Sequence, residues 1–177
     1  PWVTTEAEIN LEPGGIFRTV MCGPDGERNE GDGCVLEVIE HRRFVWTSAM
    51  GPGFQPVAAP TDGFLFTAIL EFTPTDGGAL YRATARHSTP EDAAMHAEMG
   101  FHAGWGEALN QLVAFLFPFL SILGRENTRG LSQQNVAGTE TATVFLGAIC
   151  IEQQHRIINL FHVALVRLAK ICLCAIR

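Results

Sequence analysis

Lysine is almost absent from this chain of 177 residues, in which 12 basic residues face 19 acidic ones and give a formal net charge of −7. Residues 1–117 hold six arginines, no lysine and 16 acidic residues, a charge of −10. Residues 118–177 hold five arginines, one lysine and three glutamates, a charge of +3. Nucleic-acid phosphates require a basic face. The composition therefore excludes nucleic acid as a partner.

Paired cysteine motifs and targeting signals are also missing. The five cysteines are odd in number and have no Cys-x-x-Cys spacing, which indicates reduced thiols in a cytoplasmic protein. We find no signal peptide and no Asn-x-Ser/Thr acceptor. The chain starts with Pro1 rather than Met, which is typical of a fragment or a processed chain.

Several catalytic motifs are absent as well. The sequence contains no glycine-rich phosphate loop, no nucleophile elbow and no triad order. It contains no His-x-x-x-His pair, and its cysteines are scattered. We therefore expect no cofactor and no metal.

Six stretches of the first ninety residues read as β-strands. Residues 3–11 alternate between apolar and polar, the pattern of a strand with one wet face. Turn sequences such as Pro13-Gly14-Gly15 separate the stretches, and such short links favour antiparallel neighbours. The expected strands are residues 3–11, 16–22, 33–39, 44–50, 64–73 and 79–88, with a long proline-rich loop at 51–62.

Residues 88–117 predict one long helix after the strands. Thr89 suits the N-cap, Pro90 the first position, and Glu91 and Asp92 the positive end. A step of 100° per residue places one apolar stripe against the core: Met95, Trp105, Leu109, Leu112, Val113 and Leu116. Strands followed by a helix indicate an α+β fold in which a curved antiparallel sheet grips the helix.

Glu98 and His102 fall on the same stripe, four residues apart. Such a pair could perform general acid–base chemistry, or the two side chains could simply satisfy each other at the edge of a cavity. His87 could join them as a third ligand, and three groups of this type could hold zinc, although the missing His-x-x-x-His pair disfavours it. We expect His96 and His41 to be solvated. Gly100 and Gly104 lie opposite Leu109, where a nearby loop would explain them.

Four segments carry a family resemblance: residues 14–27 (GGIFRTVMCGPDGE), 34–47 (CVLEVIEHRRFVWT), 64–72 (FLFTAILEF) and 99–112 (MGFHAGWGEALNQL). Residues 1–117 resemble the bacterial homologues of activators of heat-shock-protein-90 ATPase, in the SRPBCC or START-like superfamily. The resemblance implies a helix-grip fold of seven strands with a hydrophobic cavity between sheet and helix. It implies no shared catalytic residues.

The resemblance also suggests which side chains line the cavity. Alternation places Phe64, Phe66 and Phe72 on one face, where they form either a ligand site or plain core. The ligand-binding candidates are Phe17, Trp46, Phe64, Phe66, Met99, His102, Trp105 and Leu109.

The two ends of the chain depart from the family pattern. The first strand and the two short helices of the family have no counterpart here, so the domain at 1–117 reads as truncated. Residues 118–143 are polar and linker-like, and residues 144–177 are apolar. This tail could be an amphipathic helix that packs on the body or on a membrane surface, a membrane span, or sequence that was never selected. Asn159, His162, Arg167 and Lys170 disfavour the span.

These features together favour a domain that binds a small apolar ligand or a protein partner. One alternative is a small enzyme that uses Glu98 and His102 on a hydrophobic substrate. Another is a regulator of a chaperone ATPase, which the family name alone suggests.

Overall fold

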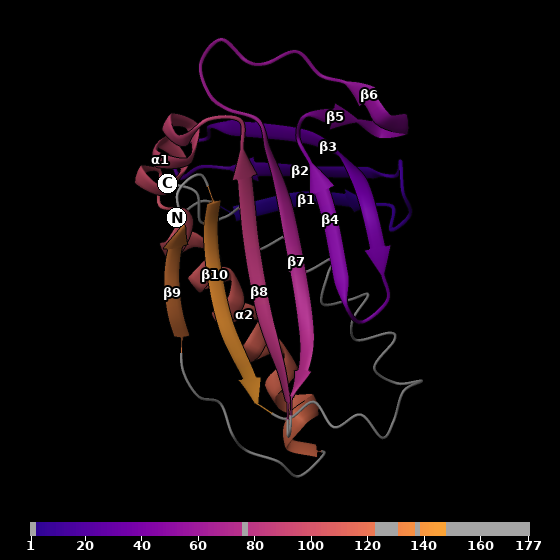
Figure 1. Ribbon diagram of the computed structural model, residues 1–177, viewed down its shortest axis with the longest axis vertical. Helices are drawn as coiled ribbons and strands as arrows, with labels where there is room; N and C mark the ends of the chain where they lie inside the picture. Colours follow the sequence, from indigo (N-terminus) through magenta and orange to yellow (C-terminus); the bar gives the residue numbers. More distant parts are fainter. Residues whose placement is uncertain (1–2, 76–77, 123–130, 137–138, 148–177) are drawn as a thin grey trace.

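An antiparallel sheet of eight strands forms the body of the protein (Figure 1). The computed structural model describes residues 3–75, 78–122, 131–136 and 139–147. The strands lie in the order β1-β2-β3-β4-β7-β8-β10-β9. Their bounds are β1 Val3–Ile9, β2 Ile16–Cys22, β3 Arg28–Ile39, β4 Arg43–Thr47, β7 Phe66–Thr75, β8 Gly78–His87, β9 Leu131–Val136 and β10 Thr139–Gly147. The predicted α+β class with a curved antiparallel sheet and a gripped helix is confirmed.

The connection from β1 to β2 shows why the predicted meander forms. Gly14 has a φ of +85°, and a Cβ on Gly15 would lie 2.2 Å from the carbonyl oxygen of Asn10. The amide of Asn10 donates to the carbonyl of Ile16 at 2.9 Å, which closes the turn. Only glycine fits a backbone approach this close. In the same sheet β3 pairs with β2, β4 with β3, β7 with β4 across the long loop, and β8 with β7.

Strand β3 is longer than the sequence predicted, because it starts at Arg28 instead of Gly33. Its first residues are exposed, polar and rich in glycine, so they lack a strand pattern. The tight Gly23 to Gly26 turn nevertheless returns the chain beside β2, where Cys22 pairs with Arg28. The loop at 51–62 also holds some order: β5 (Met50–Gly51) pairs with β6 (Gln55–Pro56) around a short 3₁₀ helix, η1 (Pro52–Phe54).

Strands β9 and β10 occupy a segment that we interpreted as a linker at 118–143 and the start of a helical tail. β10 pairs with β8 from Thr139, opposite Arg86, to Gly147, opposite Gly78. β9 pairs with the outer edge of β10 (Figure 1). The sequence reading missed both strands because their composition is polar and short of aromatic residues. The rest of the expected tail lies outside the described residues.

The predicted single helix at 88–117 is two helices. α1 spans Pro90–Glu98, and Thr89 caps it by accepting a hydrogen bond from the amide of Asp92 at 3.1 Å. α2 spans Phe101–Ile122. Gly100 stands between them with a φ of +97°, the left-handed conformation that ends many helices at glycine. The left-handed conformation at this break explains why glycine occupies position 100.

The break changes which side chains face the core. Met95, predicted to be buried, has a relative exposure of 43%, whereas Trp105 and Leu109 are buried as predicted. The side chains of Leu112, Val113 and Leu116 lie outside the described residues. The 100° periodicity therefore holds from Phe101 to Leu109 and does not extend back through Gly100 into α1.

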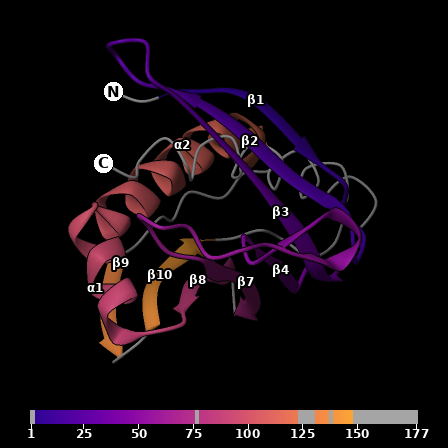
Figure 2. The ribbon, with the colours of Figure 1, turned by 90° about the horizontal axis from the view of Figure 1, so that it is seen from above.

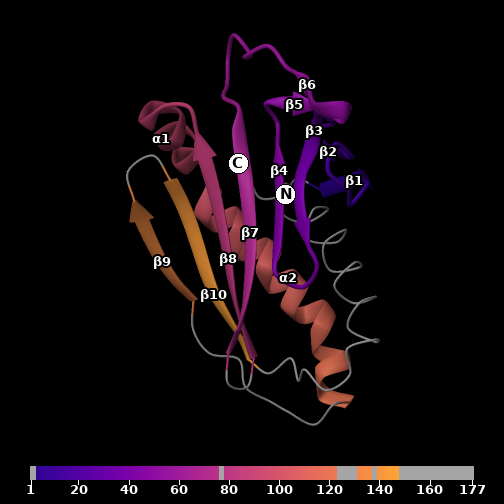
Figure 3. The same ribbon diagram turned by 45° about the vertical axis from the view of Figure 1, so that its right-hand side comes forward.

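The hydrophobic core lies between α2 and the concave face of the sheet, which bends around the helix (Figures 2 and 3). Small side chains occupy the middle of the sheet: Ala68 and Ala85 are register partners on β7 and β8, and Ala83 is two residues from Ala85. All three are completely buried. Because alanines fill little space, the large rings of Phe101 and Trp105 can join the same buried cluster.

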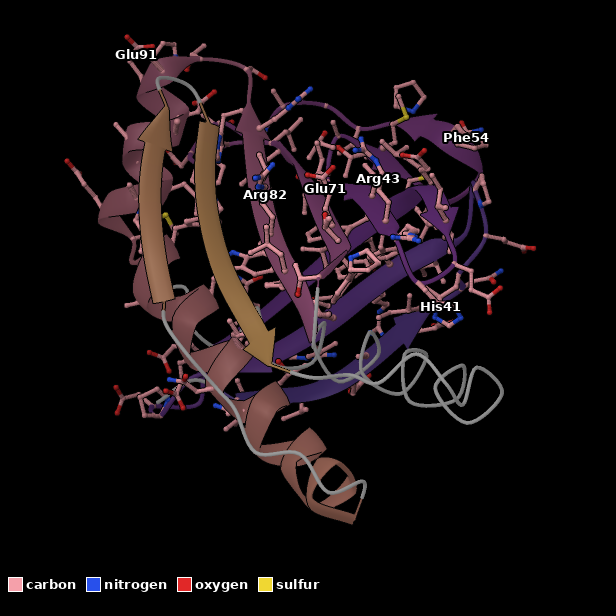
Figure 4. The ribbon with its side chains drawn as sticks, turned by 60° about the horizontal axis from the view of Figure 1, so that its bottom comes forward. His41, Arg43, Phe54, Glu71, Arg82 and Glu91 are labelled. Carbon is pink, nitrogen blue, oxygen red and sulfur yellow. The ribbon has the colours of Figure 1, made fainter. Side chains whose placement is uncertain are left out.

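The convex face carries charged side chains in cross-strand rows. The Arg43 guanidinium donates to Glu37 at 2.7 Å and to Glu71 at 2.9 Å. Arg82 lies opposite Glu71 in the register, and Figure 4 shows Arg43, Glu71 and Arg82 in one row. Partly exposed pairs of this kind stabilise a protein by about 0–1 kcal/mol each. No helix in the described part of the chain is long and apolar enough to cross a membrane.

Candidate functional site

Aromatic rings from three strands line the concave face of the sheet. Phe17 on β2 stacks on Trp46 of β4, with ring centroids 3.9 Å apart and planes 7° apart. Trp46 meets Phe66 of β7 edge-on at 5.2 Å. Phe64, just before β7, contacts Phe66 at 6.1 Å. Phe64 and Phe66 share this face, as the alternation in the sequence indicated.

Helix α2 covers the aromatic wall formed by Phe17, Trp46, Phe64 and Phe66 from the other side. Phe101 is completely buried, and Trp105 and Leu109 retain 5% and 3% of their exposure. The ring centroids of Phe101 and Trp105 lie 5.7 Å apart, as expected for side chains four residues apart on one helical face. Six of the eight predicted ligand-binding residues thus come from the wall or from the buried face of α2.

A pair of histidines lies at the end of the wall near α1. Nε2 of His87, the last residue of β8, lies 2.8 Å from Nδ1 of His96 on α1. The His96 ring has its centroid 4.7 Å from that of Phe64, 5.0 Å from Phe66 and 4.8 Å from Phe101. The pair therefore ties α1 to the sheet inside an aromatic box.

Burial, with a smaller contribution from the neighbouring imidazoles of His87 and His102, lowers the pKa of His96 to about 3. His96 is therefore neutral at physiological pH and carries one N–H. The prediction that His96 is solvated was wrong, because the side chain is completely buried. In the sequence, the three-residue spacing of Ala93 and His96 could have indicated that both face the core. The structure shows that both are buried on α1.

Two buried nitrogen atoms have no hydrogen-bond partner among the described residues: Nε2 of His96 and Nε1 of Trp105. Leaving such a group unpaired costs about 1–3 kcal/mol. Native interiors rarely tolerate this without a water or a ligand at the site. Both side chains contact the ring of Phe101, so the two nitrogens belong to one end of the interior.

The predicted acid–base pair does not share a helix face. Glu98 ends α1 with an exposed side chain, and His102 is half-buried on α2 after the break. The four-residue spacing assumed one continuous helix, and Gly100 removes that geometry. Met99, a predicted ligand-binding residue, has a relative exposure of 38%. The roles of Glu98, His102 and Met99 remain predictions.

No group of three His, Cys, Asp or Glu side chains within the described ranges has the arrangement of a metal site. The 2.8 Å contact between His87 and His96 is a hydrogen bond between two imidazoles, which requires one donor and one acceptor nitrogen. This part of the molecule therefore holds a hydrogen bond between two imidazoles inside an aromatic enclosure.

A curved antiparallel sheet closed by a long helix defines a helix-grip protein of the SRPBCC type. The chain belongs to the family described as activator of Hsp90 ATPase homolog 1-like protein, whose model matches residues 1–116. The crystal structure of protein NE0264 from Nitrosomonas europaea is similar, with 39% identity and a TM-score of 0.63. That match covers 68% of this chain and 75% of the other. A comparison with curated proteins gave no match.

Proposed function

We propose that this chain binds a small, largely apolar molecule between the concave face of the sheet and α2. The lining supports this proposal, because Trp46, Phe66 and Trp105 supply rigid aromatic surface with little polar competition. Ligand sites are commonly apolar, with a few placed polar groups that orient the ligand. Membership of a helix-grip family agrees with such a site.

The observation that carries the proposal is the pair of buried nitrogens on His96 and Trp105. The described residues offer neither atom a hydrogen-bond partner. A plain hydrophobic core would place phenylalanine at both positions and avoid the cost of the unpaired groups. Polar atoms kept inside an apolar enclosure are typical of a site that is completed by a bound molecule.

A saturable titration with an apolar fluorescent probe tests this function. Ala108 is completely buried on α2, so Ala108→Leu places extra volume in the interior and should weaken probe binding at least fivefold. Glu107→Leu adds the same side chain one residue earlier, at an exposed position, and serves as the matched control. Melting temperatures of both variants separate occlusion from unfolding. Unchanged probe affinity in folded Ala108→Leu would contradict an interior site.

Native mass spectrometry of the purified full chain complements the titration. A co-purifying small molecule would appear as a mass increment that is lost on collisional activation. The increment would identify the ligand directly and should be smaller in the Ala108→Leu sample.

A protein-interaction role is the second candidate, and exposed methionines on α1 favour it. Met95 and Met99 are four residues apart, with exposures of 43% and 38%. Flexible methionine side chains are frequent on adaptable protein-binding surfaces. The family description names activation of the Hsp90 ATPase. The test compares Hsp90 ATPase rates with the wild type and with Met95→Glu/Met99→Glu, in which stimulation should be lost while probe binding persists.

The enzyme alternative loses the shared helix face on which it depended. Glu98 is exposed at the end of α1, and the break at Gly100 separates it from the α2 face that carries Trp105. A general base must reach the proton that it abstracts. The described geometry therefore favours binding over acid–base catalysis by this pair.

A further inference from the structure

We infer that the bound molecule carries a neutral oxygen that accepts a hydrogen bond from the indole N–H of Trp105, with the imidazole of His96 as its second polar neighbour. The inference rests on the proposed ligand-binding function and adds the chemical class of the ligand. That class is an aromatic or aliphatic ketone, ester, ether or alcohol.

The indole nitrogen fixes the polarity of the ligand atom. Nε1 of Trp105 can only donate, so its partner must be an acceptor. The side chain retains 5% of its exposure, and Nε1 has no partner among the described residues. An alkane leaves this donor unpaired, and an ammonium group has no lone pair to offer it. An oxygen with a free lone pair satisfies it.

His96 adds a second polar contact at the same end of the interior. Its Nδ1 is engaged with His87, so Nε2 is the atom left to face a ligand. A neutral imidazole carries its proton on one nitrogen, and Nε2 therefore either donates or accepts. A carbonyl oxygen matches the first tautomer and a hydroxyl group matches either. The ring centroid of Phe101 lies 4.8 Å from that of His96 and 5.7 Å from that of Trp105, so both polar side chains belong to the same part of the interior.

The charge of the surroundings excludes an anionic head group. Among the described residues, the buried polar or charged side chains are Thr19, Thr47 and His96, so no buried arginine or lysine could pair with a carboxylate. Residues 1–117 also have a net charge of −10, which repels anions at long range. Burying an unpaired carboxylate costs far more than burying a neutral carbonyl group.

The test uses three molecules with a common benzene ring: ethylbenzene, acetophenone and benzoate. Their affinities for the full chain at pH 7.5 are measured by isothermal titration calorimetry. Trp105→Phe removes the donor and keeps an aromatic ring, so acetophenone should bind about five- to tenfold more weakly while ethylbenzene changes less than twofold. His96→Phe should also weaken acetophenone selectively. Benzoate should bind more weakly than acetophenone to the wild type.

Trp46→Phe is the matched control, because it replaces a second buried indole, which belongs to the sheet side of the same core. It should shift the affinities for acetophenone and ethylbenzene by the same factor. Equal changes for both molecules in Trp105→Phe, or benzoate binding as tight as acetophenone, would overturn the inference and leave the ligand-binding function standing. Binding of none of the three molecules to the wild type would overturn both.

Discussion

The buried imidazole of His96 should make the stability of the protein depend on pH. The pKa of His96 falls from an ordinary 6.5 to about 3 in the folded state, mainly because the ring is buried and also because His87 and His102 lie near it. The unfolded chain therefore binds a proton more readily between these two values. Stability is present above pH 6.5 and is lost progressively as the pH falls through this window.

The size of the effect follows from proton linkage. Between pH 7 and pH 5, a histidine with an unfolded pKa of 6.5 that stays neutral when folded contributes a loss of about 2 kcal/mol. Most carboxylates titrate below this range. The imidazoles that face His96 are His87 at the end of β8 and His102 on α2.

Urea unfolding at pH 7 and pH 5 measures this loss. His96→Phe keeps an aromatic ring in the box formed by Phe64, Phe66 and Phe101 and removes the titratable group. The wild type should lose about 2 kcal/mol more than the variant between the two pH values. An equal loss in both proteins would refute the reasoning, because His96 would then not be the buried neutral group.

Four further substitutions test the local structure, each by the free energy of urea unfolding. Gly100→Ala should destabilise the protein by about 1 kcal/mol, because φ is +97° at this position. Gly106 lies in the interior of α2 with open space where a Cβ would stand, so Gly106→Ala should stabilise the protein by about 0.5–1 kcal/mol. Stability changes of the same sign at both sites would contradict the helix break. Thr89→Ala removes the cap of α1 and should cost about 1 kcal/mol, and no change would argue against the α1 boundary. Gly15→Ala would place a Cβ 2.2 Å from the Asn10 carbonyl oxygen and should destabilise strongly, so a wild-type stability would disprove the turn.

The family resemblance and the strand alternation predicted most of the fold. Phe64, Phe66 and Phe72 are separated by even numbers of residues, so their common face could be derived from a period of two. The capping residues before α1 were equally clear. β9 and β10 could not be predicted, because the pairing of β10 with the edge of β8 and of β9 with β10 decides their conformation and local composition does not.

The sequence could not predict the burial of His96, because this burial depends on the backbone conformation of Gly100. A continuous helix through Gly100 would turn Met95 and Glu98 inward, and the sequence gives no sign that Gly100 adopts a φ of +97°. Once the helix breaks there, Met95 and Glu98 become exposed and His96 becomes buried. Identifying the partner of His96 also required the end of β8, which places His87 within hydrogen-bonding distance. Sequence spacing alone carries no such tertiary information.

The indole N–H resonance of Trp105 tests the central claim most directly. Uniformly ¹⁵N-labelled full-length chain is titrated with acetophenone, and the Trp105 signal is assigned by its absence from the spectrum of Trp105→Phe. If a neutral oxygen binds between the sheet and α2, this resonance should shift downfield and saturate, while the indole signal of Trp46 follows with a smaller change. An unmoved Trp105 signal at an acetophenone concentration that saturates the calorimetric binding curve would contradict the account.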